Sequence, residues 1–208
     1  HGRFISRVQG TTKGNVLLRK KQYQLSDDES WSLHAARLMI GGKIQNYRNI
    51  LRRYIRDYGE NEDVNQAVQV LEHAKREALT AQDKTTLIGY EGMASNAYFE
   101  VLPILILNQK ADFPFHGRNR RPPKDAVNAM LSFAYTLIAN EISAALETVG
   151  LDPYVGFLHT LRPGRTSLAL DMMEEFRAYL GDRFVLSLIN KRQITSKDFL
   201  FQGDNGVV

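Results

Sequence analysis

The sequence predicts a mainly α-helical protein. Three observations support this expectation. Apolar residues recur at helical spacing over most of the 208 residues. Glycine and proline are gathered at a few breaks, chiefly residues 109–123 and 150–164. Only residues 3–9 alternate as a strand does, and a linker at residues 11–15 separates them from the helical part.

The composition limits the classes of function. With 43% hydrophobic residues the chain can form a sizeable core. Because it has no cysteine, it cannot use disulfides, thiolate zinc sites or a cysteine nucleophile, which fits a reducing compartment. A net charge of +4 permits a polyanionic partner. No apolar run approaches the roughly 20 residues that span a bilayer, so we expect no membrane association.

The first long helix should begin at a capping box formed by Ser26 and Glu29 and end at Gly59. It has an apolar side and an opposite, basic side. The apolar side carries Trp31, Ala35, Leu38, Ile44, Tyr47, Leu51, Tyr54 and Tyr58, and the basic side carries Lys43, Arg48, Arg52, Arg53 and Arg56.

Further helices are expected along the rest of the chain. Pro103 should kink one of them and Gly150 should end another. The expected ranges are about 63–81, 83–107, 123–149, 166–180 and 182–190.

A carboxylate interrupts an apolar helix face. Leu87, Glu91, Ala94, Tyr98 and Val101 share one face, and Glu91 lies in its middle. A buried, unpaired carboxylate is costly, so Glu91 should be protonated, paired or bound to a metal. A salt bridge to an arginine of another helix is the plainer explanation, and both this pairing and metal binding remain open.

Two later segments add an imidazole and more carboxylates. His159 closes an apolar tetrapeptide before a Pro-Gly loop, where it is either a satisfied core histidine or a ligand. Asp171 and Glu174 lie on one face of a helix that Thr166 or Ser167 can cap, although such acidic pairs are commonly solvated.

Together these residues form a carboxylate, imidazole and carboxylate set. Such a set suits Mg²⁺ or Mn²⁺, which could activate a water or hydroxyl against a phosphate. Arginines on the two flanking loops are the candidate DNA contacts, because guanidinium matches phosphate geometry, although solubilising loop charge would look the same. They are Arg118, Arg120, Arg121, Arg162 and Arg165.

Three ordered blocks resemble a known family. The first block is Gly89-Tyr90-Glu91-Gly92-Met93-Ala94, continuing to Tyr98-Phe99. The second is Arg118 to Asp125, followed by Asn128-Ala129-Met130-Leu131-Ser132 and Tyr135. The third comprises Gly150 to Pro153, Gly156 to His159, Arg162 to Arg165, Ser167 to Asp171 and Glu174 to Arg177. The chain resembles the CRISPR-associated protein one family, the endonuclease/integrase of spacer acquisition. The residues of the second and third blocks are most similar to those of the type I-C branch.

The resemblance implies an α-helical catalytic domain at residues 13–208, with a tail at 199–208 that is poorly ordered. Residues 1–12 would be a remnant of the family's N-terminal β domain and a linker, which suggests a trimmed chain. Glu91, His159 and Glu174 would bind Mg²⁺ or Mn²⁺, with Asp171 as the neighbouring acidic catalytic position. Implied partners are DNA (a protospacer fragment and a CRISPR repeat), a second copy of the chain and a small partner Cas protein, in the prokaryotic cytoplasm.

Two other functions remain open from the residues alone. The chain could be a non-catalytic helical DNA-binding module whose carboxylates pair with arginines. It could also be a helical metal oxidoreductase, although that class commonly uses Glu-x-x-His pairs and none occurs here.

Overall fold

The computed structural model describes residues 15–119, 121–201 and 206–207. Over these residues the chain is helical and forms no strand beyond a single antiparallel bridge, so the mainly α prediction is confirmed. The expected strand at 3–9 and Arg120 lie outside the described residues. The elements are α1 (Val16–Asp27), α2 (Glu29–Tyr58), α3 (Glu62–Thr80), α4 (Lys84–Val101), η1 (Leu102–Leu105), α5 (Ala126–Val149), α6 (Ser167–Phe176), the π-helical η2 (Arg177–Asp182), α7 (Arg183–Asn190) and η3 (Ser196–Asp198).

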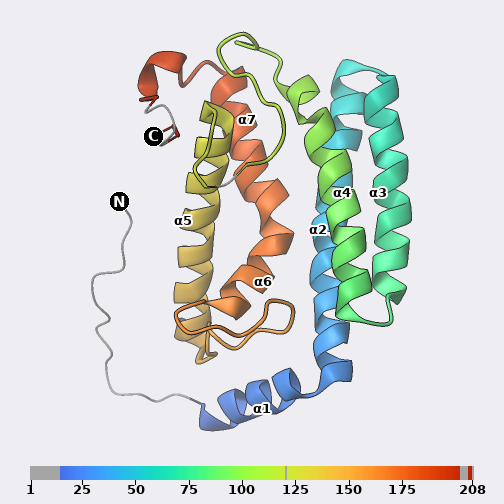
Figure 1. The fold of residues 1–208 in the computed structure, drawn as a ribbon, viewed down its shortest axis with the longest axis vertical. Coiled ribbons are helices and arrows are strands. Elements are labelled where there is room, and N and C mark those ends of the chain that lie inside the picture. Colours follow the sequence, from blue (N-terminus) through green and yellow to red (C-terminus); the bar gives the residue numbers. More distant parts are fainter. Residues whose placement is uncertain (1–14, 120, 202–205, 208) are drawn as a thin grey trace.

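The helices form two adjoining groups. Helices α2, α3 and α4 stand side by side, and α5 packs along the continuous run α6–η2–α7 (Figure 1). Helix α1 crosses one end of α2 (Figure 1). Because α2 also contacts α6 and η2, it joins the two groups, and residues facing that contact lie at the centre of the molecule.

Side-chain caps fix where the helices begin. Asp28, Asn61, Asp83 and Asp125 each accept a hydrogen bond from the backbone N–H three residues later, which satisfies a donor that the first turn leaves unpaired. The predicted capping box at Ser26 is wrong, because α1 continues to Asp27 and Asp28 caps α2. Gly59 and Gly150 end α2 and α5 as predicted, both at positive φ.

Helix α2 is buried on more than one side. The expectation that Lys43 and Arg48 lie on a solvated basic face is wrong, because Lys43 is 3% exposed and Arg48 pairs with Glu72 of α3. The amphipathic pattern assumed one buried face, whereas α2 packs against α3 and α4 on one side and α6 on another. Arg52, Arg53 and Arg56, nearer its end, are exposed.

Two predicted helices end earlier than expected. Helix α4 stops at Val101, and Pro103 lies in the 3₁₀ turn η1 that follows, so the chain leaves the α-helix rather than kinking within it. Helix α6 stops at Phe176 and passes into the π-helical η2, which buries Arg177 and Asp182.

Helix α5 is long and apolar enough, by length and composition, to cross a membrane, and 22% of its most apolar window is buried. The expectation that no segment reaches this threshold is therefore wrong for α5. The helix is rich in alanine, which raises its hydropathy without a run of large side chains. Phe133 and Leu137, one turn apart on it, are exposed.

Part of the C-terminal tail lies against the fold. Phe201 and Val207 form the antiparallel bridge, and Val207 is buried. Its backbone N–H donates to the carbonyl of Pro123 at 2.9 Å, next to the start of α5.

Candidate functional site

Two predicted ligands meet at one ammonium group. Lys43 of α2 contacts Oε1 of Glu91 on α4, and its Nζ lies 2.7 Å from Oε2 of Glu174 on α6. Lys43 and Glu174 are buried, whereas Glu91 is 24% exposed. Ser95, one turn after Glu91, donates its hydroxyl to the same Oε1 at 2.8 Å. The two carboxylates therefore surround a single cation at the contact between α2, α4 and α6.

Arg177 orients the second carboxylate. Its Nη2 lies 2.8 Å from Oε1 of Glu174, which leaves Oε2 directed at Lys43. Oε2 lies within ion-pair distance of the ammonium, and no other described group donates a hydrogen bond to this buried oxygen. Burial raises the pKa of Glu174, but Lys43 and Arg177 lower it by more, so its net pKa is lowered and the group stays ionised.

Lys43 is a fixed positive charge. Burial alone lowers its pKa, whereas Tyr47, Glu174 and Glu91 act in the opposite direction and prevail, so its net pKa is raised. The ammonium is therefore protonated at neutral pH. Removing it would leave Glu91 without its paired cation and Glu174 with Arg177 alone.

The His159 loop is held by Asp171. This fully buried carboxylate accepts backbone N–H bonds from Phe157, Leu158 and His159 at 2.6, 2.9 and 2.9 Å. Its Oδ1 also lies 2.5 Å from Nδ1 of His159. Because an ionised carboxylate only accepts, Nδ1 carries the proton, and the lone pair of Nε2 is left for a ligand. Thr166 occupies the N-cap position of this helix but forms no side-chain cap bond.

Gly156 permits this arrangement. A Cβ on Gly156 would lie 2.5 Å from Oδ2 of Asp171 and 2.8 Å from the backbone N of Leu168. Both distances are shorter than side chains tolerate, and one of the atoms is backbone. The loop can therefore pass this close to α6 only because residue 156 is glycine.

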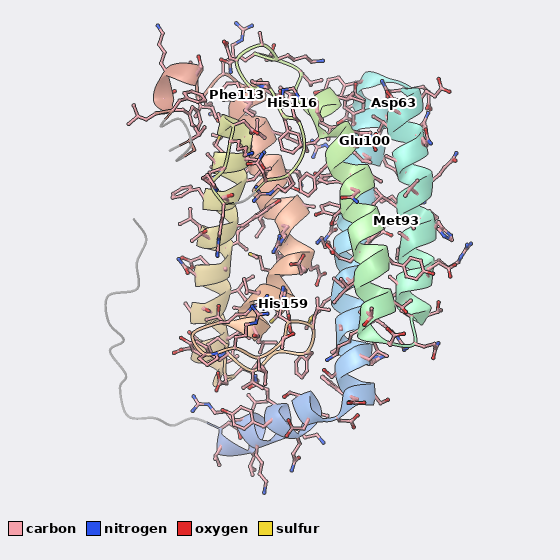
Figure 2. All side chains as sticks on the ribbon, viewed as in Figure 1. Asp63, Met93, Glu100, Phe113, His116 and His159 are labelled. Carbon is pink, nitrogen blue, oxygen red and sulfur yellow. The ribbon has the colours of Figure 1, made fainter. Side chains whose placement is uncertain are left out.

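His159 is near the carboxylates without joining them. It lies on the loop before α6 (Figure 2), close enough that its protonated form would lower the pKa of Glu174. Across the described ranges, no three His, Asp or Glu side chains are close enough to hold an ion as they stand. The structure thus brings Glu91 and Glu174 together and pairs His159 with Asp171. The donor set still fits a divalent cation: Lys43 is a stand-in cation between two carboxylates, and Oε2 of Glu174 has no described partner besides this ammonium.

The predicted DNA-contacting arginines have different surroundings. Arg118 donates to Oδ1 of Asn128 at 2.7 Å and to Oγ of Ser132 at 3.0 Å, and its guanidinium lies over the Tyr135 ring, so it secures its loop against α5. Arg121 and Arg162 are exposed and Arg165 is half-buried.

Sequence reasoning missed Lys43 and Arg177 as site residues. A signal for Lys43 was present, because it lies three residues after Ile40 and four before Tyr47, both buried on α2. The preceding Gly42 lets Glu175 of α6 approach, since a Cβ there would lie 3.1 Å from its side chain. For Arg177, the signal is its position three residues after Glu174 on a helix.

Comparison with known proteins gives consistent results. The family model for the CRISPR associated protein Cas1 matches residues 1–208. The chain is 50% identical over 202 residues to the CRISPR-associated endonuclease Cas1 1 of Chlorobaculum tepidum, covering 96% of this chain and 59% of that protein. It is 46% identical over 187 residues to a CRISPR-associated endonuclease Cas1 of Leptospira interrogans, covering 88% and 73%.

Solved structures share the fold. A CAS1 protein from Thermotoga maritima matches with a TM-score of 0.80 at 28% identity, covering 94% of this chain and 59% of that one. A casposase bound to integration product matches with a TM-score of 0.77 at 28% identity, covering 93% of this chain and 52% of that one. A partial Cas6-RT-Cas1–Cas2 complex matches with a TM-score of 0.85 at 26% identity, covering 99% of this chain and 62% of that one. The helical architecture, the Glu91–Glu174 pair and these matches lead to one conclusion: the chain belongs to the Cas1 family.

Proposed function

We propose that this chain carries the catalytic centre of a metal-dependent DNA endonuclease/integrase that joins DNA 3′-hydroxyls to a CRISPR repeat. The observation that supports this most is that Glu91 of α4 and Glu174 of α6 reach one and the same cation. The chain spans 59% of the length of its Chlorobaculum relative, so the activity of a whole protein enters only through this proposal. We assign the chain to the type I-C branch as part of this proposal, on the basis of the residues in the second and third sequence blocks.

Glu91, His159 and Glu174 would hold Mg²⁺ or Mn²⁺. When bound, such an ion supplies Lewis-acid polarisation of a phosphate oxygen and activates an attacking water or hydroxyl. The protein's own groups do the rest. Arg177 fixes the rotamer of Glu174, and Asp171 fixes the tautomer of His159 so that Nε2 is free. Lys43 would leave the space between the carboxylates and could then neutralise a phosphate.

The proposed partners are DNA, a second copy of the chain and a small Cas protein. Support for the first comes from the casposase bound to integration product, and for the last from the structure that contains Cas1 and Cas2. Exposed Phe133 and Leu137 on α5 give an apolar surface on which a protein partner could dock.

One observation favours the alternative of a non-catalytic DNA-binding module. Lys43 already pairs with both carboxylates, as that alternative requires of a cation from another helix. The two proposals differ in whether a divalent ion displaces the ammonium. They therefore predict different responses to metal.

A cleavage assay separates them. We expect Mn²⁺-dependent cleavage of DNA that EDTA abolishes and that Glu91→Ala eliminates. Glu100→Ala is the matched control, because Glu100 is an exposed glutamate near the end of the same helix (Figure 2). DNA binding without metal-dependent cleavage by the unaltered chain would support the binding module instead.

A further inference from the structure

A basic groove lies beside the candidate site. It has a volume of about 620 Å³ and runs between α2 on one side and η2 and α7 on the other. No carboxylate lines it. Its polar lining is Asn46, Asn49, Arg52, Arg53, Arg56 and Arg183.

The charge of this groove is weakly compensated. Arg53 and Arg56 share the single carboxylate of Asp57, at 3.2 and 2.9 Å, and both guanidinium groups are largely exposed. Arg52 and Arg183 form no ion pair with any residue that the structure describes. Exposed ion pairs of this kind contribute little to stability, so a phosphate can replace Asp57 as the partner of these arginines at little cost.

One end of the groove lies about one helical turn from the candidate site. Asn46 lies three residues after Lys43 on α2 and donates its Nδ2–H to the carbonyl of Glu175 at 2.9 Å, next to Glu174. From there Asn46, Asn49, Arg53 and Arg56 follow one another at spacings of three and four, so they form one stripe on α2. At 1.5 Å per residue the stripe is about 15 Å long. That equals the rise of about four nucleotides of one B-form strand.

An aromatic ring lies on the opposite wall. Tyr179 of η2 is 57% exposed, and the guanidinium of Arg183 lies over it, 4.6 Å from the ring centre. Exposed aromatic rings beside arginines form stacking platforms for unpaired bases. A row of guanidinium groups facing a ring suits a nucleic acid strand better than a small anion, which would need one or two of them.

We propose that this α2–α7 groove binds the phosphates of a DNA strand whose reacting phosphate lies at Lys43, Glu91 and Glu174. The inference rests on the proposed function, and it assigns the path along which the DNA leaves the site. The strand passes Asn46 first, then the α2 arginines on one side and Tyr179 with Arg183 on the other.

Salt-dependent DNA binding tests the groove. We expect the double variant Arg52→Ala/Arg183→Ala to bind a short DNA roughly tenfold more weakly at low salt. The slope of log K against log salt should fall by about 1.8 for duplex DNA, since each lost phosphate contact contributes about 0.9. Neither arginine has an ion pair in the described fold, and the Tyr179 ring that Arg183 lies over is exposed, so the melting temperature should change little. Lys110→Ala/Lys197→Ala is the matched control: it removes the same charge at exposed positions outside the groove.

Site-specific cross-linking gives a second readout. Because the chain has no cysteine, the variant Asn49→Cys places one thiol in the groove, and Lys197→Cys places one outside it. With a DNA strand that carries a thiol-reactive tether on its backbone, we expect a cross-link at position 49 and none at position 197. Equal loss of affinity in both double variants, or no cross-link at position 49 while DNA binds, would overturn the groove alone. An unaltered chain that binds no DNA would overturn the proposed function itself.

Discussion

The Nζ of Lys43 lies 2.7 Å from Oε2 of Glu174 and also contacts Glu91, so one buried ammonium occupies the space between two carboxylates on different helices. A lysine at this point keeps Glu174 ionised and holds the two carboxylates close together in the absence of metal. The same charge would compete with a divalent cation for the same oxygens. Lys43 is therefore the residue through which the proposed metal binding would affect the stability of the fold.

Replacing this lysine should expose that competition. We expect Lys43→Met to lower the free energy of unfolding by about 3–5 kcal/mol without metal, because Glu91 loses its cation and Glu174 keeps only Arg177. Mn²⁺ should raise the melting temperature of this variant more than that of the unaltered chain, since no ammonium has to be displaced. Thermal unfolding with and without Mn²⁺ measures both effects.

The control for this prediction is Arg48→Met, five residues along the same helix. Arg48 pairs with the exposed Glu72, so its loss should cost at most about 1 kcal/mol and leave the Mn²⁺ effect unchanged. If Mn²⁺ stabilised Lys43→Met and the unaltered chain equally, the ammonium would not be competing for the ion.

Gly156→Ala should disrupt the loop that carries His159. The added methyl would collide with Asp171 and with the backbone of Leu168, and we expect a loss of about 1–3 kcal/mol in unfolding free energy. Gly89→Ala is the matched control: nothing lies within 4 Å of a Cβ there, and alanine in a helix should be neutral or stabilising by about 0.5–1 kcal/mol. Chemical denaturation compares the two, and equal stability would show that the loop can move away from α6.

Asp182 should make stability depend on pH. Burial raises its pKa from 3.8 to about 6, although Tyr135, Tyr98, Arg177 and Arg118 act in the opposite direction. A carboxyl whose folded pKa is raised contributes stability below its unfolded pKa, and this is lost as pH rises through the folded value. Asp182→Asn cannot ionise and keeps an acceptor for the Tyr135 hydroxyl. As the pH rises from 4 to 7, the melting temperature of the variant should therefore increase relative to that of the unaltered chain. A difference between the two melting temperatures that does not change with pH would contradict this.

Arg162 and Arg165 should act on DNA rather than on the fold. They lie in a Pro-Gly loop, one exposed and the other half-buried, with neither in an ion pair among the described residues. Changing both to alanine should weaken DNA binding and flatten its salt dependence, with little change in melting temperature. A large fall in melting temperature with unchanged DNA binding would reverse the assignment.

The sequence was a good guide where local chemistry decides the outcome. The two glycines at 59 and 150 mark helix ends, because they act on neighbouring backbone groups, whereas the predicted cap at Ser26 was wrong. The apolar face around Glu91 was also readable, and Leu87, Ala94, Tyr98 and Val101 are all buried. These features depend on residues within one or two turns of each other.

It was a poorer guide where several helices meet. Lys43 looked like surface charge because periodicity along α2 cannot show that a third helix, α6, packs on its other side. Arg118 was predicted only as a DNA contact, and its hydrogen bonds to Asn128 and Ser132 on the next helix could not be anticipated from spacing along the chain. The pairing of His159 with Asp171 likewise depends on a loop folding back on α6, a tertiary event that sequence spacing does not record.

The most direct measurement is the anomalous difference map of a crystal soaked in Mn²⁺. The proposed function predicts one peak roughly 2.0–2.3 Å from oxygens of Glu91 and Glu174, with Nε2 of His159 turned toward it and the Lys43 ammonium moved away. A map in which Lys43 stays between the two carboxylates, with no peak beside them, would contradict the metal centre.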